Sequence, residues 1–135
     1  MNPAPFESLD YLYLPASEID AAVAFYANVL GGELLWKIRE GSTCVAAVRL
    51  TADGPALVLA NHLRPGDGLL IYRVENLAAT RQALVERGWS AEADSIELPQ
   101  GPCLVFRDPA GQRLAIYERL RPGMDQRFAG RFDDQ

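Results

Sequence analysis

The pattern of apolar and polar residues predicts a strand at residues 9–15 and then a helix at residues 17–30. Ser17 is expected to cap this helix, with Asp20 at the capping-box position reaching back to its first turn. The glycine pair at 31–32 ends the helix. Three further apolar runs predict strands at 33–40, 43–50 and 55–62.

The same order of elements then starts again. A strand is predicted at 69–74, and Asn76 is expected to cap a second helix over 76–87 that ends at Gly88. Ile19 in the first helix corresponds to Leu77 in the second, 58 positions later. The last three strands are predicted at 90–98, 101–108 and 112–119. The pattern therefore predicts an α+β fold of two βαβββ units, whose sheets each have one face under a helix and the other around a shared cleft.

The length, charge and apolar content of the chain limit the kinds of protein it could be. The chain has 135 residues, which is most simply one domain, and its net charge of −5 argues against a nucleic-acid partner. No apolar run approaches the length of a membrane span, and the N-terminus lacks the features of a signal peptide, so we expect a cytoplasmic protein without a membrane partner. Cys44 and Cys103 are interpreted as free thiols.

Three stretches carry a family resemblance: "ASEIDAAVAFYANVLGGEL", "RVENLAATRQALVERGW" and the closing "FRDPAGQRLAIYE". Together with the duplicated βαβββ order, they resemble the vicinal oxygen chelate superfamily, also called the glyoxalase/bleomycin-resistance/dioxygenase family. The resemblance covers roughly residues 8–119. It implies a single such domain over 1–135, with module one at about 8–63, module two at about 67–119 and a peripheral tail at 120–135.

The resemblance also implies that the modules curl into paired half-barrels and that the chain forms a homodimer. It does not imply one activity, because these modules occur in isomerases, epimerases, ring-cleaving dioxygenases, thiol transferases and metal-free drug-binding proteins. Metal-dependent members place ligands at four inward positions, which fall here on Tyr11, Val58, Leu69 and Ala115. Three of these residues offer no donor atom to a divalent ion. We therefore expect no metal ligands, no cofactor, and a cleft in which the small Ala115 leaves room.

Several residues have alternative interpretations. Arg73 and Arg113 have the inward parity of their strands and could meet an anionic ligand, although a salt bridge to Glu33 or Glu118 is favoured. The single histidine, His62, could orient a ligand or serve only as a strand-end residue. The aromatic side chains could line the cleft or pack in the core. The predicted ligand-binding residues are Tyr11, Tyr13, Trp36, His62, Leu69, Arg73, Phe106, Arg113, Ala115 and Tyr117.

The tail beyond residue 120 lies outside the resemblance. Phe128 and Phe132 are four residues apart and could form one turn that docks on the domain or on a partner subunit, and a disordered tail is the alternative.

Together these observations favour a metal-free protein that binds a small, largely apolar or aromatic compound, such as a natural product or antibiotic, for sequestration, sensing or resistance. The alternative is a metal-dependent lyase, isomerase or dioxygenase with displaced ligands, for which His62, Glu33 and Glu118 are the candidate donors. A third hypothesis is an adaptor whose dimer surface is its function.

Overall fold

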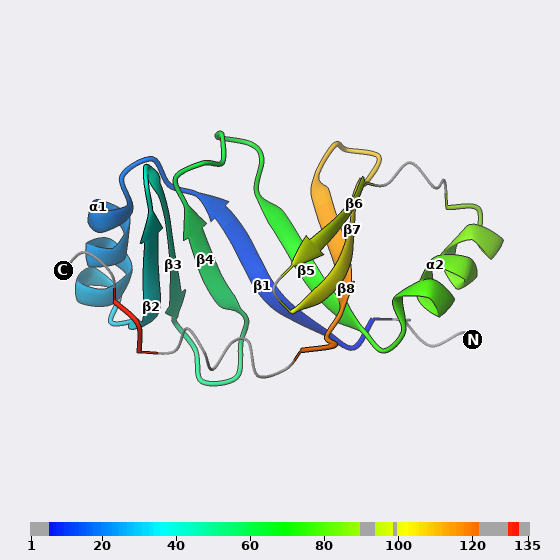
Figure 1. The fold of residues 1–135 in the computed structure, drawn as a ribbon, viewed down its shortest axis with the longest axis horizontal. Coiled ribbons are helices and arrows are strands. Elements are labelled where there is room, and N and C mark those ends of the chain that lie inside the picture. The colour runs from blue at the N-terminus through cyan, green and yellow to red at the C-terminus, as the bar shows by residue number, and fades with distance from the viewer. Residues whose placement is uncertain (1–5, 90–93, 99, 122–129, 133–135) are drawn as a thin grey trace.

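Eight strands of the described chain form one continuous mixed sheet (Figure 1). The computed structural model describes residues 6–89, 94–98, 100–121 and 130–132. The strands lie in the order β2-β3-β4-β1-β5-β8-β7-β6. They are β1 (Ser8–Pro15), β2 (Glu33–Glu40), β3 (Thr43–Arg49), β4 (Ala56–Ala60), β5 (Leu69–Val74), β6 (Asp94–Leu98), β7 (Gly101–Arg107) and β8 (Arg113–Glu118). The helices are α1 (Ile19–Ala24), the π-helical turn η1 (Phe25–Val29) that continues it, and α2 (Leu77–Glu86).

The two predicted βαβββ units are confirmed. In each unit the first strand runs parallel to the last, β1 beside β4 and β5 beside β8. The expectation of two separate sheets is wrong, because β1 and β5 pair in antiparallel fashion and join the units edge to edge. Tyr11 lies opposite Ile71 and Tyr13 opposite Leu69 in this ladder. The junction places the opening strands of both units at the centre of the sheet.

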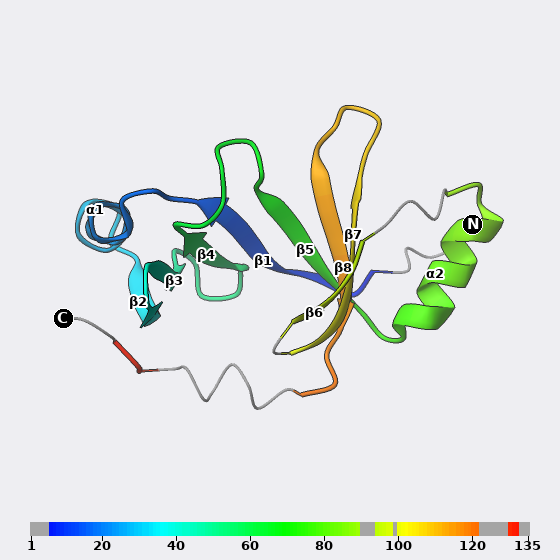
Figure 2. The same cartoon turned by 45° about the horizontal axis from the view of Figure 1, so that its top comes forward.

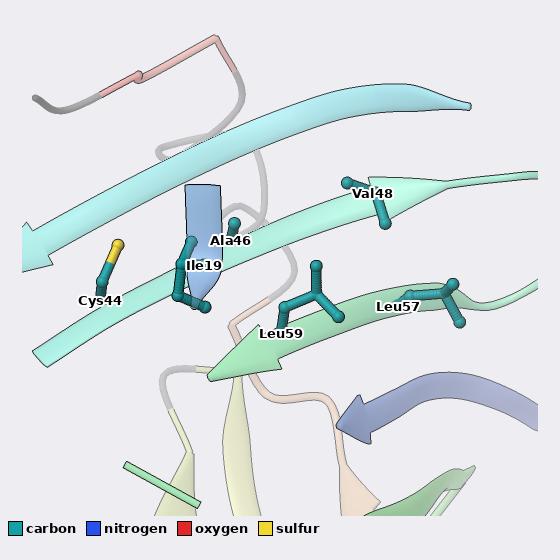
Figure 3. Packing of buried hydrophobic residues seen from close by; sticks show 6 residues of the cluster. All are labelled: Ile19, Cys44, Ala46, Val48, Leu57 and Leu59. Carbon is teal, nitrogen blue, oxygen red and sulfur yellow. The ribbon is translucent and has the colours of Figure 1, made fainter. Parts of the chain in front are cut away.

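The helices lie at opposite ends of the sheet (Figures 1 and 2). Ile19 of α1 packs against β3 and β4, and Figure 3 shows this cluster of Ile19, Cys44, Ala46, Val48, Leu57 and Leu59. A second cluster on the α2 side contains Val74, Leu104 and Ile116, with Leu77 and Leu84 of the helix packed against it. No helix in the described ranges is long and apolar enough to cross a membrane.

The start of the first helix differs from the prediction. Glu18, not Ser17, is the N-cap residue, and its side chain makes no capping hydrogen bond. The Asp20 carboxylate does not reach back to the first turn; it forms an ion pair with Lys37 of β2. The predicted apolar stripe is only partly buried, because Val29 is 69% exposed and Leu30 is 49% exposed.

Two β-bulges change which way side chains point. The register of β1 against β5 shifts between Leu9 and Tyr11, and the register of β2 against β3 shifts between Leu34 and Trp36. Without a bulge, Leu34 and Trp36 would point to the same face. Instead Leu34 packs against the α1 cluster and Trp36 faces the opposite side of the sheet.

Residues 130–132, which Figure 1 draws in red, pair with the outer edge of β2. The Gly130 amide donates to the Leu35 carbonyl at 2.9 Å, and the Lys37 amide donates to the Arg131 carbonyl at 2.7 Å. Phe132 forms a parallel bridge with Lys37. Gly130–Phe132 therefore dock on their own domain by strand pairing, and the predicted turn from Phe128 to Phe132 begins outside the described residues.

Candidate functional site

The face of the sheet opposite the helices contains a cavity of about 510 Å³. Side chains from both modules line it, since the central strands β1, β4 and β5 supply its floor and β2, β3, β6, β7 and β8 its sides. The lining residues are Tyr11, Tyr13, Trp36, Ile38, Glu40, Thr43, Val45, Val58, His62, Leu63, Leu69, Ile71, Ile96, Leu98, Gln100, Cys103, Arg113 and Arg131. The wall is mostly apolar with a few polar groups, which is the usual composition of a small-molecule site.

Six of the ten predicted site residues lie on this wall: Tyr11, Tyr13, Trp36, His62, Leu69 and Arg113. Strand register explains part of the arrangement. Val58 lies opposite Tyr13, and Tyr13 lies opposite Leu69, so one row of side chains crosses the centre of the cavity. Trp36 joins the same row through Ala47, which lies opposite both Trp36 and Val58.

The other four predicted residues are not among the lining residues. Ala115 is 0% exposed and is packed in the cluster that contains Leu69 and Tyr117, beneath the cavity wall. Tyr117 is equally buried. Phe106 faces the α2 side, where it packs edge to face on Trp89 with ring centroids 5.4 Å apart.

The expected partners of the two inward arginines are wrong. Arg73 pairs with Glu7 at 3.4 Å and lies 3.8 Å from the Asp10 carboxylate. Arg113 donates from Nη1 to the Asp67 carbonyl at 2.7 Å. The partners of Arg73 lie at and just before the start of β1, and the partner of Arg113 lies in the loop before β5. The alternation of side chains along a strand does not identify such neighbours from other segments.

Glu33 and Glu118 have other positions. Glu118 accepts a hydrogen bond from the Leu77 amide at 2.8 Å and so holds the N-terminus of α2 on the helix side of the sheet. Glu33 begins the outer strand β2, where it is exposed and lies opposite Arg49.

The four positions aligned with the family's metal ligands lie close together, on two neighbouring rows of residues that run across the paired strands. Tyr11 is joined through Ile71 to Ala115, and Val58 through Tyr13 to Leu69. Valine, leucine and alanine carry no donor atom, and a neutral phenol is a poor ligand, so this donor set does not fit a divalent metal.

The geometry does not support the alternative in which His62, Glu33 and Glu118 bind a metal in place of the aligned positions. His62 lies at the cavity, where its ring meets Tyr13 at 6.1 Å in an edge-on contact, whereas Glu118 is at the N-terminus of α2. Within the ranges that the structure describes, no three His, Cys, Asp or Glu side chains gather as a metal site would require.

Burial controls the protonation of groups at the cavity. It raises the pKa of the Cys103 thiol to about 12, so this side chain is a neutral part of the wall near pH 7. Burial also raises the pKa of Tyr13 above its ordinary value. Neither group is poised to ionise at neutral pH, and the prediction of Cys103 as a small buried residue agrees with its 1% exposure.

Sequence reasoning missed several lining residues, above all Ile38, Val45, Gln100 and Arg131. Ile38 is two residues beyond Trp36 with no register shift between them, and Val45 lies opposite Ile38 in the β2–β3 ladder, so alternation from the predicted Trp36 was the signal that could have found both. Gln100 precedes β7, and Arg131 reaches the cavity through the pairing of the C-terminal residues with β2.

This fold and cavity can be compared with known proteins. The model of one protein family, Glyoxalase/Bleomycin resistance protein/Dioxygenase superfamily, matches residues 8–116. The chain belongs to this superfamily. No curated protein matches the sequence.

Solved structures of superfamily members share the fold. Methylmalonyl-CoA epimerase from Mycobacterium tuberculosis is 15% identical with a TM-score of 0.67, covering 90% of this chain and 94% of that chain. Catechol 2,3-dioxygenase is 18% identical with a TM-score of 0.66, covering 86% of this chain and 42% of that chain. A superfamily member from Vibrio splendidus 12B01 is 15% identical with a TM-score of 0.58, covering 82% of this chain and 97% of that chain. At these identities the likeness concerns the fold alone.

Proposed function

We propose that this superfamily member binds a small, largely apolar or aromatic organic compound in the cavity, without a metal, and thereby sequesters it. The observation that carries the proposal is the cavity of about 510 Å³, whose wall is apolar across its centre and contains few polar groups. Binding sites for small organic molecules commonly have volumes of about 300–1,000 Å³ and this kind of lining.

The aromatic side chains support a flat ligand. Tyr13 and Trp36 lie on the same central row, and Tyr11 lies one row away. Aromatic rings offer a large apolar surface and favour stacked or edge-on contacts with other rings. The donor set at the four aligned positions, which does not fit a metal, supports binding rather than metal-dependent chemistry.

A fluorescent probe tests the proposal. 8-Anilinonaphthalene-1-sulfonate, which brightens in apolar surroundings, should bind the folded protein with a saturable response at one site per chain. Val58, at the centre of the cavity floor, is the residue to enlarge. Val58→Trp should weaken probe binding by at least about tenfold, because the indole takes up cavity volume, at a cost in stability of about 1–3 kcal/mol.

The matched control is Val29→Trp. Val29 is exposed on η1, away from the cavity lining, so the same substitution there should leave probe affinity unchanged. Substitution of Ala115 is less informative than the sequence suggested, because this residue is completely buried and a tryptophan there would test core packing. Equal probe affinity in wild type, Val58→Trp and Val29→Trp would show that the cavity is not the binding site.

Homodimer assembly, which the family resemblance implies, is also proposed. Size-exclusion chromatography with light scattering measures it directly. A mass of two chains supports the proposal, and a mass of 14.8 kDa, that of one chain, contradicts it.

A further inference from the structure

One end of the cavity carries a positively charged side chain. Arg113, the first residue of β8, lines the cavity, and its Nη1 donates to the Asp67 carbonyl at 2.7 Å. Asp67 belongs to the loop of residues 61–68 between β4 and β5, and the same loop supplies two further wall residues, His62 and Leu63. We call the part of the wall formed by Arg113, His62 and Leu63 the loop end of the cavity.

Arg113 has a hydrogen-bond partner but no counter-ion. Its partner is the main-chain carbonyl of Asp67, and no carboxylate of the described residues forms an ion pair with it. Arg73, the other arginine predicted to point inward, pairs with Glu7 and lies 3.8 Å from Asp10. A guanidinium keeps its positive charge and carries several N–H donors, of which one carbonyl accepts only one here. The remaining donors of Arg113 are therefore available to a ligand.

The wall beside Arg113 is apolar. Leu69 and Arg113 are the first residues of β5 and β8, which run parallel, and both line the cavity. Leu69 lies opposite Tyr13 in β1, and Tyr13 lies opposite Val58. The guanidinium thus lies at the end of the row of side chains that crosses the centre of the cavity.

The cavity has two other charged side chains on its described wall, Glu40 and Arg131, and both belong to the β2 side. Glu40 is the last residue of β2, where it is exposed, and the Arg131 carbonyl accepts from the Lys37 amide of the same strand. In the sheet, β3, β4, β1 and β5 lie between β2 and β8 (Figure 1). Glu40 therefore does not neutralise Arg113.

A ligand that fills the cavity changes the surroundings of Arg113. In the unliganded cavity, solvent can satisfy the free N–H groups of its half-buried side chain. A neutral, apolar ligand would remove that solvent and leave a charge without a partner, which is costly in an apolar setting. An oxyanion would replace the solvent with charge-assisted hydrogen bonds, and the fork of a guanidinium matches the two oxygens of a carboxylate.

We propose that the ligand is an aromatic organic acid, whose oxyanion binds Arg113 while its apolar body lies over the central row of Val58, Tyr13 and Leu69. This inference rests on the proposed function and deepens it. Arg113 is then the residue that selects an acid over a neutral compound of similar shape, and the Asp67 carbonyl holds the guanidinium in position.

Two probes that differ only in a sulfonate group test this. 8-Anilinonaphthalene-1-sulfonate is an anion, and N-phenyl-1-naphthylamine is the same molecule without the sulfonate. Arg113→Gln should weaken binding of the anion by about tenfold and change binding of the neutral probe by less than about twofold, because only the anion loses a charged partner. Fluorescence titration measures both affinities.

The choice of variants separates charge from structure. The glutamine amide of Arg113→Gln can still donate to the Asp67 carbonyl, so the contact with the loop is kept while the charge is lost. Arg113→Met, which keeps an unbranched apolar chain, is the second variant and should give the same selective loss. Arg81→Gln is the matched control: it removes the same charge from an exposed position on α2, and both probes should bind as they do to wild type. Thermal melting verifies that each variant is folded.

The outcomes distinguish the two proposals. If Arg113→Gln and Arg113→Met bind the anion as tightly as wild type does, or weaken both probes equally, the acid inference is overturned and cavity binding stands. A selective loss that also appears in Arg81→Gln overturns it as well, because the effect would then come from net charge. If neither probe binds wild type, the proposed function is wrong and the acid inference is wrong with it.

Discussion

The helices α1 and α2 occupy corresponding places in the two modules but are attached to the sheet in different ways. α1 has no side-chain cap, and an ion pair from its Asp20 to the buried Lys37 fixes it to β2. α2 begins with the Asn76 side chain accepting from the Ala79 amide at 2.9 Å, and Glu118 holds the Leu77 amide. One helix is held along its side, and the other at its beginning.

The cores beneath the two helices differ in how completely they are buried. In the cluster under α1, Ile19 is 4% exposed and Leu59 is 1% exposed, whereas Leu104 under α2 is 8% exposed. Both cores border a hollow, which Leu59 lines together with Ala22 and Leu104 lines together with Leu77 and Val85. A duplicated topology thus preserves the order of the strands and not the interactions that secure each helix. Three sets of variants test this difference between the modules.

Core truncation should give the largest effect and should differ between the modules. Leu59→Ala in module one should lower the free energy of unfolding by about 3–5 kcal/mol, because Leu59 is 1% exposed and its side chain is almost wholly packed. Leu104→Ala in module two should cost only about 2–3 kcal/mol, because Leu104 is 8% exposed and so loses less buried surface. Urea denaturation measures both values. Equal losses would show that the difference in burial between Leu59 and Leu104 does not set the cost of truncation.

Removal of the helix caps should have an intermediate effect and the opposite asymmetry. Asn76→Ala should lower the free energy of unfolding by about 1 kcal/mol, because the Ala79 amide loses its partner. Ser17→Ala should change it by less than about 0.5 kcal/mol, because Ser17 is an exposed residue outside the N-cap position. A cost for Ser17→Ala comparable to that of Asn76→Ala would mean that α1 is capped after all.

The smallest expected effect concerns the pH dependence of the α1 attachment. The hydrogen bond and the charge of Lys37 hold the pKa of Asp20 below its ordinary value. A carboxyl whose pKa is depressed on folding contributes stability above its unfolded pKa and loses it as the pH falls through the folded pKa. The stability difference between wild type and Asp20→Asn should therefore be constant near neutrality and narrow below about pH 4.

Asp53→Asn, at an exposed turn, serves as the control and should give a stability curve parallel to that of wild type throughout. If the Asp20→Asn difference instead widens toward acid, the ion pair with Lys37 does not contribute in the way described.

Much of the fold could be predicted from the sequence because its signals are local. The apolar run at 69–74 is strand β5, and Asn76 and Gly88 bound the second helix as expected, with Gly88 in the left-handed region at φ 94°. The prediction of how α1 begins was wrong for a physical reason. Ser17 and Asp20 have capping-box spacing, but Lys37, seventeen residues beyond Asp20 in the chain, binds the Asp20 carboxylate more favourably.

The candidate site was predicted less completely than the fold. A β-bulge reverses the face of the sheet to which the following side chains point, and it leaves little trace in the amino-acid sequence. Parity identified Tyr11, Tyr13 and Leu69 as cavity residues. It also placed Ala115 and Tyr117 on the correct face, but could not show that they lie beneath the wall. The bulge at Asp10 and the hydrogen bond that Asp10 accepts from Tyr117 depend on three-dimensional proximity between β1 and β8, which no local pattern records.

The pairing of Gly130–Phe132 with β2 affects how copies of the protein can associate through the edges of their sheets. A sheet with two open edges can gain strands at both ends, so a chain of molecules could grow without limit. Here Gly130–Phe132 pair with the middle of β2 and interrupt one edge, and within the described ranges β6 is the strand at the other end of the sheet. Two molecules that met through their β6 strands would leave only the interrupted β2 edges exposed, and a short, interrupted edge disfavours further growth.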